Sequence, residues 1–337
     1  MELIRKFNNI SKSDASLAGG KGASLGEMSQ AGFPVPAGFV ILASTFDKFL
    51  HESDLKQEIE AILDTVNHEE IHTIQHASEK IQKLILDSKM PADTSRSIKE
   101  SYEELQGSTL YKVEPCLYEH GFYVAVRSSA TAEDSASAAW AGQLDTFLNT
   151  TEDTLLENTK RCWASLFTAR AIFYRFEKGL HKSKISVAVV VQKMVVSDVA
   201  GIAFSVHPVT EDKDQLIIEA AFGLGEAVVS GQITPDSYVV SKHEVLNSKH
   251  ETNLEAIIDK NIVEQERAIF RKEGGGDEWQ DLEAKGKKQK LSDEQIIELS
   301  KLIIKIENHY GFPCDIEWAL EGETFYITQS RPITTLS

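Results

Sequence analysis

Four polar residues near the C-terminus have the types and spacing of a site for a metal and a phosphate. Asp315 and Glu317 are two residues apart in one alternating run, and Gln329 and Arg331 are two residues apart in the next. Residues two apart on a strand share a face. Carboxylate and amide oxygens suit magnesium, and an adjacent arginine can hold the phosphate that the metal bridges. The alternative interpretation is the ordinary polar face of an edge hairpin.

The register of this hairpin decides between the two interpretations. The runs DIEWAL and TFYITQSRP flank Glu321 and Gly322, which is a hairpin signature. A simple two-residue turn there would direct the two polar pairs to opposite faces. An odd-length loop or a β-bulge would bring them to the same face. The sequence therefore predicts shared metal binding only if the hairpin is irregular.

A second candidate is Lys21 in the stretch AGGKGAS, just where a helical pattern begins. The stretch is not a Walker loop, because a serine stands five residues before the lysine, where GxxxxGK[ST] needs glycine. Glycines still allow backbone amides to approach phosphate, and a helix N-terminus adds partial positive charge. The alternative is a plain turn that caps a helix.

A third candidate is Arg127, which ends the β-rich run YVAVR and opens a loop of small and acidic residues. Arginine in that position can grip phosphate bidentately. The alternative is a salt bridge to the nearby Glu133 or Asp134. The arginine alone does not decide between them.

Three other patterns favour no site. FGLGEAVVSG lacks the third glycine of a dinucleotide fingerprint, so its glycines are expected to serve tight turns. His68, His72 and His76 share a helix face but lack a carboxylate or cysteine that would complete a metal site, which favours a solvated face. Cys314 has no paired histidine nearby and is interpreted as a small buried hydrophobe.

The elements that must position the candidates follow from periodicity. Helical blocks are expected at about 53–106, packing as a small bundle, and at 151–180 as one long helix. Short β-rich runs follow, and the charged, glycine-containing stretch 271–290 predicts a solvated loop. Ser292 and Gln295 form a capping box for a last helix that Gly311 ends.

Composition limits the class of protein. The chain has 337 residues, is 42% hydrophobic and carries a formal net charge of -17, which argues against a general nucleic-acid or anionic-membrane surface. Its three cysteines show no metal or disulfide spacing, and it contains no apolar run of signal-peptide or membrane-helix length. A cytoplasmic location is expected, with anionic ligands held by a few local basic residues.

Seven motifs in order carry a resemblance that covers nearly the whole chain: GGKGASLGEM, FPVPAGF, VAVRSSATAEDSASAAWAGQLDTFLN, WASLFTARAIFYR, QKMV, FGLGEAVVSGQITPDSYVV and DIEWAL with ITQSRP. Together they resemble the ATP-binding domain of the phosphoenolpyruvate synthase (pyruvate, water dikinase) family. The same domain is the N-terminal domain of pyruvate, phosphate dikinase and of rifamycin phosphotransferase. The resemblance implies an α+β, ATP-grasp fold in which two subdomains sandwich the nucleotide. Residues 1–184 would form the first subdomain, with phosphate-binding loops and the helical insert. Residues 185–337 would form the second, with adenine-side strands and the metal-binding hairpin.

The resemblance also implies a role for each matching residue. Lys21 and Arg127 would bind phosphates and, with Arg331 at the terminal phosphates, would be the catalytic cations. Mg²⁺ would be held by Glu317 and Gln329 with support from Asp315. The remaining contacts to ATP would come from Gly142 and Thr146 in a covering loop and from Gln192, Met194 and Val195 beside the adenine.

In this family ATP yields AMP, and the β-phosphoryl group passes to a histidine on a separate domain and then to the acceptor. The chain has no segment resembling the phosphohistidine domain or the pyruvate-binding barrel. It is therefore expected to be the phosphoryl-donor half of a dikinase, incomplete without histidine and acceptor domains on the same full-length protein or a separate chain. The alternatives are the donor domain of a rifamycin phosphotransferase and a catalytically silent nucleotide-binding module.

Overall fold

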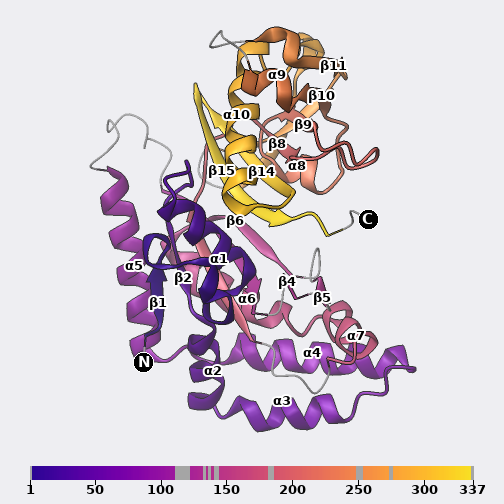
Figure 1. Cartoon of the computed structure of the whole chain (residues 1–337). Coiled ribbons are helices and arrows are strands. Elements are labelled where there is room, and N and C mark those ends of the chain that lie inside the picture. The colour runs from indigo at the N-terminus through magenta and orange to yellow at the C-terminus, as the bar shows by residue number, and fades with distance from the viewer. Residues whose placement is uncertain are drawn as a thin grey trace. The chain divides into compact units, whose positions relative to one another are not determined.

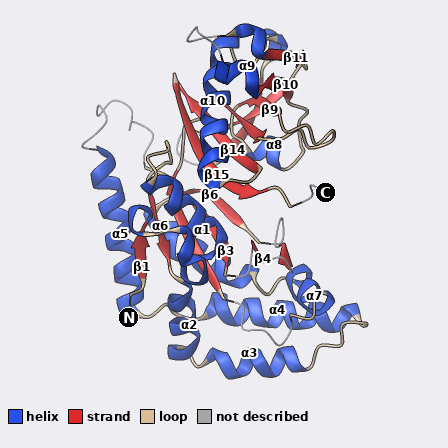
Figure 2. Ribbon diagram, viewed as in Figure 1, coloured by secondary structure: helices blue, strands red, loops and turns tan. Residues whose placement is uncertain are grey.

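The computed structural model describes residues 2–110, 122–131, 134–135, 138–139, 144–180, 186–247, 253–272 and 276–334. Its elements mix helices with antiparallel sheets (Figures 1 and 2), which confirms an α+β fold. The chain forms two compact units, one of Met1–Ala31 with Ala37–Met194 and the other of Gly32–Pro36 with Val195–Ser337. Within the described ranges, no helix combines the length and the apolar character needed to cross a membrane.

The first unit is built on a five-stranded sheet with the order β1-β2-β7-β3-β6. The strands of this unit are β1 (Ile4–Lys6), β2 (Gly38–Ile41), β3 (Val124–Ala130), β4 (Asp134–Ser135), β5 (Ala138–Ala139), β6 (Thr146–Thr150) and β7 (Val187–Lys193). β4 and β5 pair with each other outside the five-stranded sheet. Its helices are α1 (Ala15–Gln30), α2 (Ala43–Glu52), α3 (Leu55–Asp64), α4 (Ile71–Asp87), α5 (Ala92–Leu110), α6 (Glu152–Ser165) and α7 (Ala169–Glu177).

The central strands of this sheet are buried on both faces. Helix α1 packs on β3 and β7 from one side, whereas α6 packs on the same strands and bonds to the side chains that point the other way. Strand β7 pairs with β3 and therefore belongs to the first unit, which ends at Met194. The boundary predicted from the sequence lies at residue 184. The core includes Trp163, which stacks on Phe46 at 5.4 Å between ring centroids.

Two expectations for the helices are wrong. Residues 151–180 form two helices instead of one, because Thr168 adopts an extended conformation and its hydroxyl accepts a hydrogen bond from the Ala171 amide, which starts α7. The block 53–106 does not form a bundle of its own. Although α3 packs against α4 (Figure 1), α4 packs on α6 and α7, and α5 packs on β1, β2 and α6.

The second unit is built on a six-stranded sheet with the order β11-β10-β9-β8-β14-β15, all antiparallel. The strands of this unit are β8 (Val199–Phe204), β9 (Gln215–Phe222), β10 (Asp236–Ser241), β11 (Ile257–Asn261), β12 (Arg267–Arg271), β13 (Asp277–Asp281), β14 (Cys314–Glu321) and β15 (Thr324–Pro332). β12 and β13 pair with each other outside the six-stranded sheet. Its helices are α8 (Glu226–Val229), α9 (Lys242–Asn247) and α10 (Asp293–Tyr310).

Side-chain alternation gives this sheet two different faces. Cys314, Ile316 and Trp318 are buried, and α10 packs on β14. Cys314 is fully buried, which confirms the prediction of a buried hydrophobe, and this burial raises the pKa of its thiol to about 12. Asp315 and Glu317 alternate with these residues, so they lie on the other face, where both are half-buried.

Most described residues of the stretch 271–290 are exposed, as expected, but the stretch is not a loop. Strand β13 pairs with β12, with Trp279 opposite Ile269, and residues 283–287 form a helical turn. The guanidinium of Arg267 lies 4.4 Å from the Trp279 ring centroid. The hairpin was not predicted because its second strand carries one large apolar residue among charged ones, which is a weak period-2 signal.

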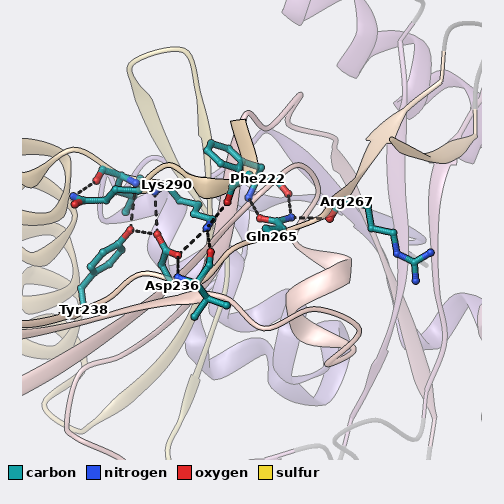
Figure 3. A network of polar contacts seen from close by, with 10 residues as sticks. Phe222, Asp236, Tyr238, Gln265, Arg267 and Lys290 are labelled. Carbon is teal, nitrogen blue, oxygen red and sulfur yellow. Dashed lines mark hydrogen bonds and ion pairs between the residues drawn. The ribbon is translucent and has the colours of Figure 1, made fainter. Parts of the chain in front are cut away.

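A buried ion pair anchors this region to the sheet (Figure 3). The ammonium of Lys290 lies 2.8 Å from Oδ1 of Asp236, and neither side chain is exposed to solvent. The Tyr238 hydroxyl and the Lys290 amide both donate to Oδ2 of Asp236. Nearby, the side-chain amide of Gln265 bonds to the backbone of Phe222 as a neighbouring strand would. Its Oε1 accepts from the Phe222 N–H at 2.9 Å, and its Nε2 donates to the Phe222 carbonyl at 3.1 Å. Each buried polar group in this set therefore has a partner, as burial requires.

The other patterns behave as expected. Gly223 has φ +88° in the turn after β9, which confirms that a glycine of the FGLG run serves a tight turn. His68, His72 and His76 are exposed, which confirms a solvated face, although His68 precedes α4 and stacks on Phe176. Ser292 and Gln295 form the capping box of α10, and Gly311 ends that helix with φ +75°.

Candidate functional site

The C-terminal hairpin is irregular in the way that the polar pairs require. Glu321 pairs with Thr324 around a two-residue turn at Gly322 and Glu323, and Trp318 still follows this register by pairing with Ile327. A β-bulge then shifts the register by one residue. As a result, Glu317 lies opposite Gln329, and Asp315 lies opposite Arg331. Directly opposed residues share a face, so all four candidates lie on one side of the hairpin.

Asp315 and Arg331 form an ion pair on that face. The Nε and Nη2 atoms of Arg331 lie 2.9 and 2.7 Å from Oδ2 of Asp315. The Asp315 side chain is 13% exposed and that of Arg331 is 46% exposed. Burial raises the pKa of Asp315, and the guanidinium opposes this shift without cancelling it. The partly desolvated carboxylate of Asp315 therefore orients the guanidinium of Arg331.

Glu219 joins the same face and was not predicted. Glu317 pairs with Ile202 of β8, which in turn pairs with Glu219 of β9, so the two glutamates lie in one row across the sheet. Burial raises the pKa of Glu219, and the charge of Asp315 adds to the shift. A lone carboxylate within the apolar run QLIIEAAF was the available signal, because a charged group in a central strand is uncommon unless it has a partner or a function.

The donor set fits magnesium only in the presence of other ligands. Among the described residues, no three or more acidic, histidine or cysteine side chains gather closely enough to hold a metal ion. Mg²⁺ is usually bound by one or two carboxylates together with water and substrate phosphates. Glu317 and Gln329, opposed on one face, match that partial set.

In the first unit the strand register collects three further candidates. Arg127 pairs with Thr146, and Gln192 pairs with Ala125, two residues before Arg127, so the three side chains share a face. Nη1 of Arg127 donates to Oε1 of Gln192 at 3.4 Å, and the two residues are only 8% and 3% exposed. Nε2 of Gln192 is buried and has no hydrogen-bond partner within the described part of the chain. A buried donor without a partner is costly, which makes it a candidate ligand contact.

Lys21 lies beside a break in α1. Gly19 has φ +70° and ψ 172°, so the helical segment that contains Lys21 begins just after it. Ser129 of β3 occupies this break: its hydroxyl donates to the Ala18 carbonyl at 3.0 Å and accepts from the Gly22 amide at 3.2 Å. A Cβ on Gly19 would lie 2.2 Å from that hydroxyl oxygen, so the close approach requires glycine.

The remaining candidates are Met194, Val195 and Gly142. Met194 is buried, and its Sδ accepts a hydrogen bond from the Asn149 amide at 2.9 Å. Val195 is also buried and opens the second unit's main segment. Gly142 and Glu133 lie outside the described residues, as does the side chain of Asp134, so the salt-bridge alternative for Arg127 stays untested. The predicted residues divide between the units, with Lys21, Arg127, Thr146, Gln192 and Met194 in the first and Val195, Asp315, Glu317, Gln329 and Arg331 in the second.

Comparison with known families gives the site its context. Residues 15–337 match the family model described as pyruvate phosphate dikinase, AMP/ATP-binding domain. The chain belongs to this family. The match covers every candidate residue described above, in both units.

Curated relatives of this AMP/ATP-binding domain carry two kinds of name. The chain is 43% identical to a probable phosphoenolpyruvate synthase of Methanocaldococcus jannaschii, over 100% of this chain and 27% of that protein. It is 39% identical to the phosphoenolpyruvate synthase of Pyrococcus furiosus, over 99% of this chain and 44% of the relative. It is also 39% identical to the rifampicin phosphotransferase of Bacillus subtilis, over 99% of this chain and 36% of the relative. The chain thus spans less than half the length of each of these relatives.

Proposed function

We propose that this chain is an ATP-grasp domain that binds Mg·ATP and serves as the phosphoryl-donor half of a phosphoenolpyruvate synthase-type dikinase. ATP would give AMP, and the β-phosphoryl group would pass to a histidine on a separate domain and then to pyruvate. The observation that carries the proposal is the bulged hairpin, which sets Glu317 opposite Gln329 and Asp315 opposite Arg331 in a chain of the AMP/ATP-binding family.

The proposed roles follow from the chemistry of phosphoryl transfer, which is mostly positioning and neutralisation of charge. Lys21 and Arg127 bind phosphate oxygens, and Arg331, oriented by Asp315, holds the terminal phosphates. Glu317 and Gln329 hold Mg²⁺, and Glu219 lies two strands from Glu317 in the same row. The metal, when bound, supplies positive charge at the phosphate oxygens.

Other side chains would recognise the rest of the nucleotide. Gln192 offers its unpartnered Nε2 to the adenine, beside Met194 and Val195. Gly142 and Thr146 belong to the loop that covers the phosphates. Two buried free thiols, Cys162 and Cys314, support the proposed cytoplasmic location.

The acceptor distinguishes this proposal from its nearest alternative. One of the relatives is named rifampicin phosphotransferase, so the alternative to pyruvate is a rifamycin-type acceptor. Supplying the histidine domain of each kind in trans and following AMP formation with either acceptor would separate the two. ATP binding without transfer to any histidine domain would instead favour a silent nucleotide-binding module.

The first test is calorimetric titration with a non-hydrolysable ATP analogue, with and without magnesium. The parent chain should bind more tightly with magnesium, and Glu317→Ala should lose that gain. Lys21→Ala and Arg127→Ala should weaken binding in both conditions, by about tenfold or more for each lost charged contact. The control is Glu323→Ala, which removes the same charge from the exposed turn of the same hairpin. No binding to the parent chain, or equal behaviour of Glu317→Ala and Glu323→Ala, would contradict the proposal.

A further inference from the structure

Strand β6 carries a β-bulge where it pairs with β3. Val126 pairs with Phe147 and Val124 pairs with Thr150, so β6 has one residue more than β3 between the two pairs. Asn149 lies within the bulge and has a left-handed backbone with φ +50°. Few non-glycine residues adopt this conformation, although asparagine tolerates it better than most. The strand therefore departs from regular geometry at Asn149, inside the sheet that carries Arg127.

The bulge makes a contact with a residue beyond its own strand pair. The backbone amide of Asn149 donates a hydrogen bond to the thioether of Met194, with 2.9 Å between N and Sδ. Met194 directly follows β7, and β3 lies between β7 and β6 in the sheet. The Met194 side chain therefore extends over β3 to reach the bulge. A β-bulge can redirect a backbone group in this way because it disrupts the ladder locally.

The backbone of Met194 is fixed as well, and it places the side chain on the face of Gln192. The Met194 amide donates to the Tyr123 carbonyl at 3.1 Å, which continues the pairing of β7 with β3 by one residue. Residues two apart on a strand share a face, so Met194 lies on the face of Gln192. Ala125, which pairs with Gln192, contributes only a methyl group to that face. A small side chain thus lies between Gln192 and the bulge.

A methionine benefits from such a contact more than a branched side chain would. Its side chain is unbranched and flexible, so packing alone defines its position poorly. A thioether is a weak hydrogen-bond acceptor, so this bond orients the side chain more than it stabilises the fold. Ordering a side chain before a ligand arrives removes part of the entropy cost of binding.

We propose that Asn149 is a positioning residue for recognition of the purine base. Its amide, placed by the bulge, holds the Met194 thioether on the face of Gln192 and so gives the base a preformed apolar surface. Asn149 acts through Met194 and need not touch the nucleotide. This inference rests on the proposed function, because it places the adenine beside Gln192 and Met194.

Three variants separate the donor, the acceptor and the side chain of Asn149. Deletion of Asn149 removes the donor and lets β6 pass β3 without a bulge, with both flanking pairs kept in register. Met194→Leu removes the acceptor at similar volume. Asn149→Gly keeps the backbone amide and suits the left-handed conformation. The matched control is Met90→Leu, which replaces a buried methionine of the core between α4 and α5.

The first measurement is the order parameter of each methionine methyl group without nucleotide, from NMR relaxation of methyl-labelled protein. The chain has four methionines, so the signals can be assigned by substitution. Deletion of Asn149 should lower the order parameter of Met194 but not those of Met28 and Met90, and Asn149→Gly should preserve all three. This readout does not depend on the proposed function. Unchanged order of Met194 in the deletion variant, or equal loss in Asn149→Gly, would overturn the inference.

Hydrogen exchange at the Asn149 amide tests the same bond from the acceptor side. Met194→Leu should speed this exchange, because leucine offers no acceptor, whereas Met90→Leu should not. This comparison carries the test if the deletion variant folds poorly. Equal exchange at Asn149 in the two leucine variants would overturn the inference.

The second measurement is the affinity for the ATP analogue. Deletion of Asn149 and Met194→Leu should each weaken binding by about two- to tenfold, the range expected when one side chain must be ordered on binding. The loss should be the same with and without magnesium, because the contact is to the base. Asn149→Gly should lose less than the deletion. Undiminished affinity in the deletion variant, or a loss seen only with magnesium, would overturn the inference.

The methyl signals also locate the base. Binding of the ATP analogue to the parent chain should shift the Met194 methyl resonance, through the ring current of the base, more than those of Met28 and Met90. An unmoved Met194 resonance in the bound parent chain would overturn the inference.

The two proposals fail in distinguishable ways. If the parent chain binds no nucleotide, the proposed function fails and the inference falls with it. If the parent chain binds with magnesium and Glu317→Ala loses that gain, while the deletion of Asn149 binds as the parent chain does, only the positioning role of Asn149 is overturned.

Discussion

The candidate residues of the two units are assembled in different ways. In the second unit Asp315, Glu317, Gln329 and Arg331 come from one hairpin, and its register places them together. In the first unit Lys21, Arg127 and Gln192 come from distant segments that meet through the sheet and the packing of α1 on it. A local register can be upset by a slip of one residue, whereas a tertiary cluster depends on contacts between elements.

The two regions also differ in what stabilises them. The turn at Gly19 is held by the neutral hydroxyl of Ser129, which is fully buried. In the second unit a buried ion pair joins Asp236 on β10 to Lys290 on the segment that follows β13. In the sheet, β9 and β8 separate β10 from the hairpin strands β14 and β15. Disruption in the first unit should therefore reach the candidate site directly, and disruption of the ion pair should mainly affect the stability of its unit.

The largest expected effect tests the ion pair. Lys290→Met leaves Asp236 buried without its cation and should destabilise the second unit by about 3–5 kcal/mol. Urea unfolding followed by tryptophan fluorescence would measure the loss. The matched control is Lys260→Met, which breaks a more exposed pair with Asp293 and should cost no more than about 1 kcal/mol.

The result for Lys290→Met also bears on the comparison of the regions. In the absence of urea, the folded variant should still show magnesium-dependent nucleotide binding. Stability losses of similar size for Lys290→Met and Lys260→Met would show that the buried pair is no anchor.

A smaller effect is expected for Ser129→Ala, which leaves the Gly22 amide without its acceptor. An unsatisfied buried donor costs about 1–3 kcal/mol, and nucleotide affinity should fall with and without magnesium because the turn beside Lys21 loosens. Thermal unfolding and titration would measure the two losses. Ser165→Ala removes another buried hydroxyl, which bonds to Cys162 and Ser128 on the other face of the sheet, and should affect stability only.

That experiment can contradict the contrast directly. Equal nucleotide affinity in Ser129→Ala and Ser165→Ala would mean that Ser129 supports the fold but not the position of Lys21. Loss of affinity only in the presence of magnesium would link Ser129 to the hairpin, against the division described here.

The smallest expected effect is a release of protons in the second unit. Burial raises the pKa values of Asp315 and Glu219, so each carboxyl contributes stability at low pH that is lost as pH rises through its raised pKa. A bound magnesium ion favours the ionised forms. Binding of Mg·ATP at mildly acidic pH should therefore release less than about one proton per carboxyl, and the release should vanish at higher pH, where both are already ionised.

Calorimetry in buffers with different ionisation enthalpies would detect this release. Asp315→Asn should reduce it, whereas Glu323→Gln, at the exposed turn, should not. Proton uptake on binding, or a release that grows with pH, would contradict the assignment of the metal to this face.

Several features could be predicted because their signals are local. The capping box of Ser292 and Gln295 and the end of α10 at Gly311 depend on neighbouring residues. The α6–α7 break was missed because the apolar spacing continues through it while Thr168 starts a new helix. Strand β13 was missed because its pairing with β12, and not its own composition, stabilises it.

The sequence by itself determined which residue types alternate along the hairpin and which single basic residues stand beside glycines and strand ends, because these depend on spacing along the chain. It also carried the ordered motifs that identify the family. Only the tertiary structure decided that a bulge would bring Gln329 opposite Glu317, that Glu219 would share their row, and that Ser129 would occupy the break at Gly19. The physical reason is that each of these three depends on hydrogen bonds or close contacts between separate segments, whose energies no single stretch of sequence contains.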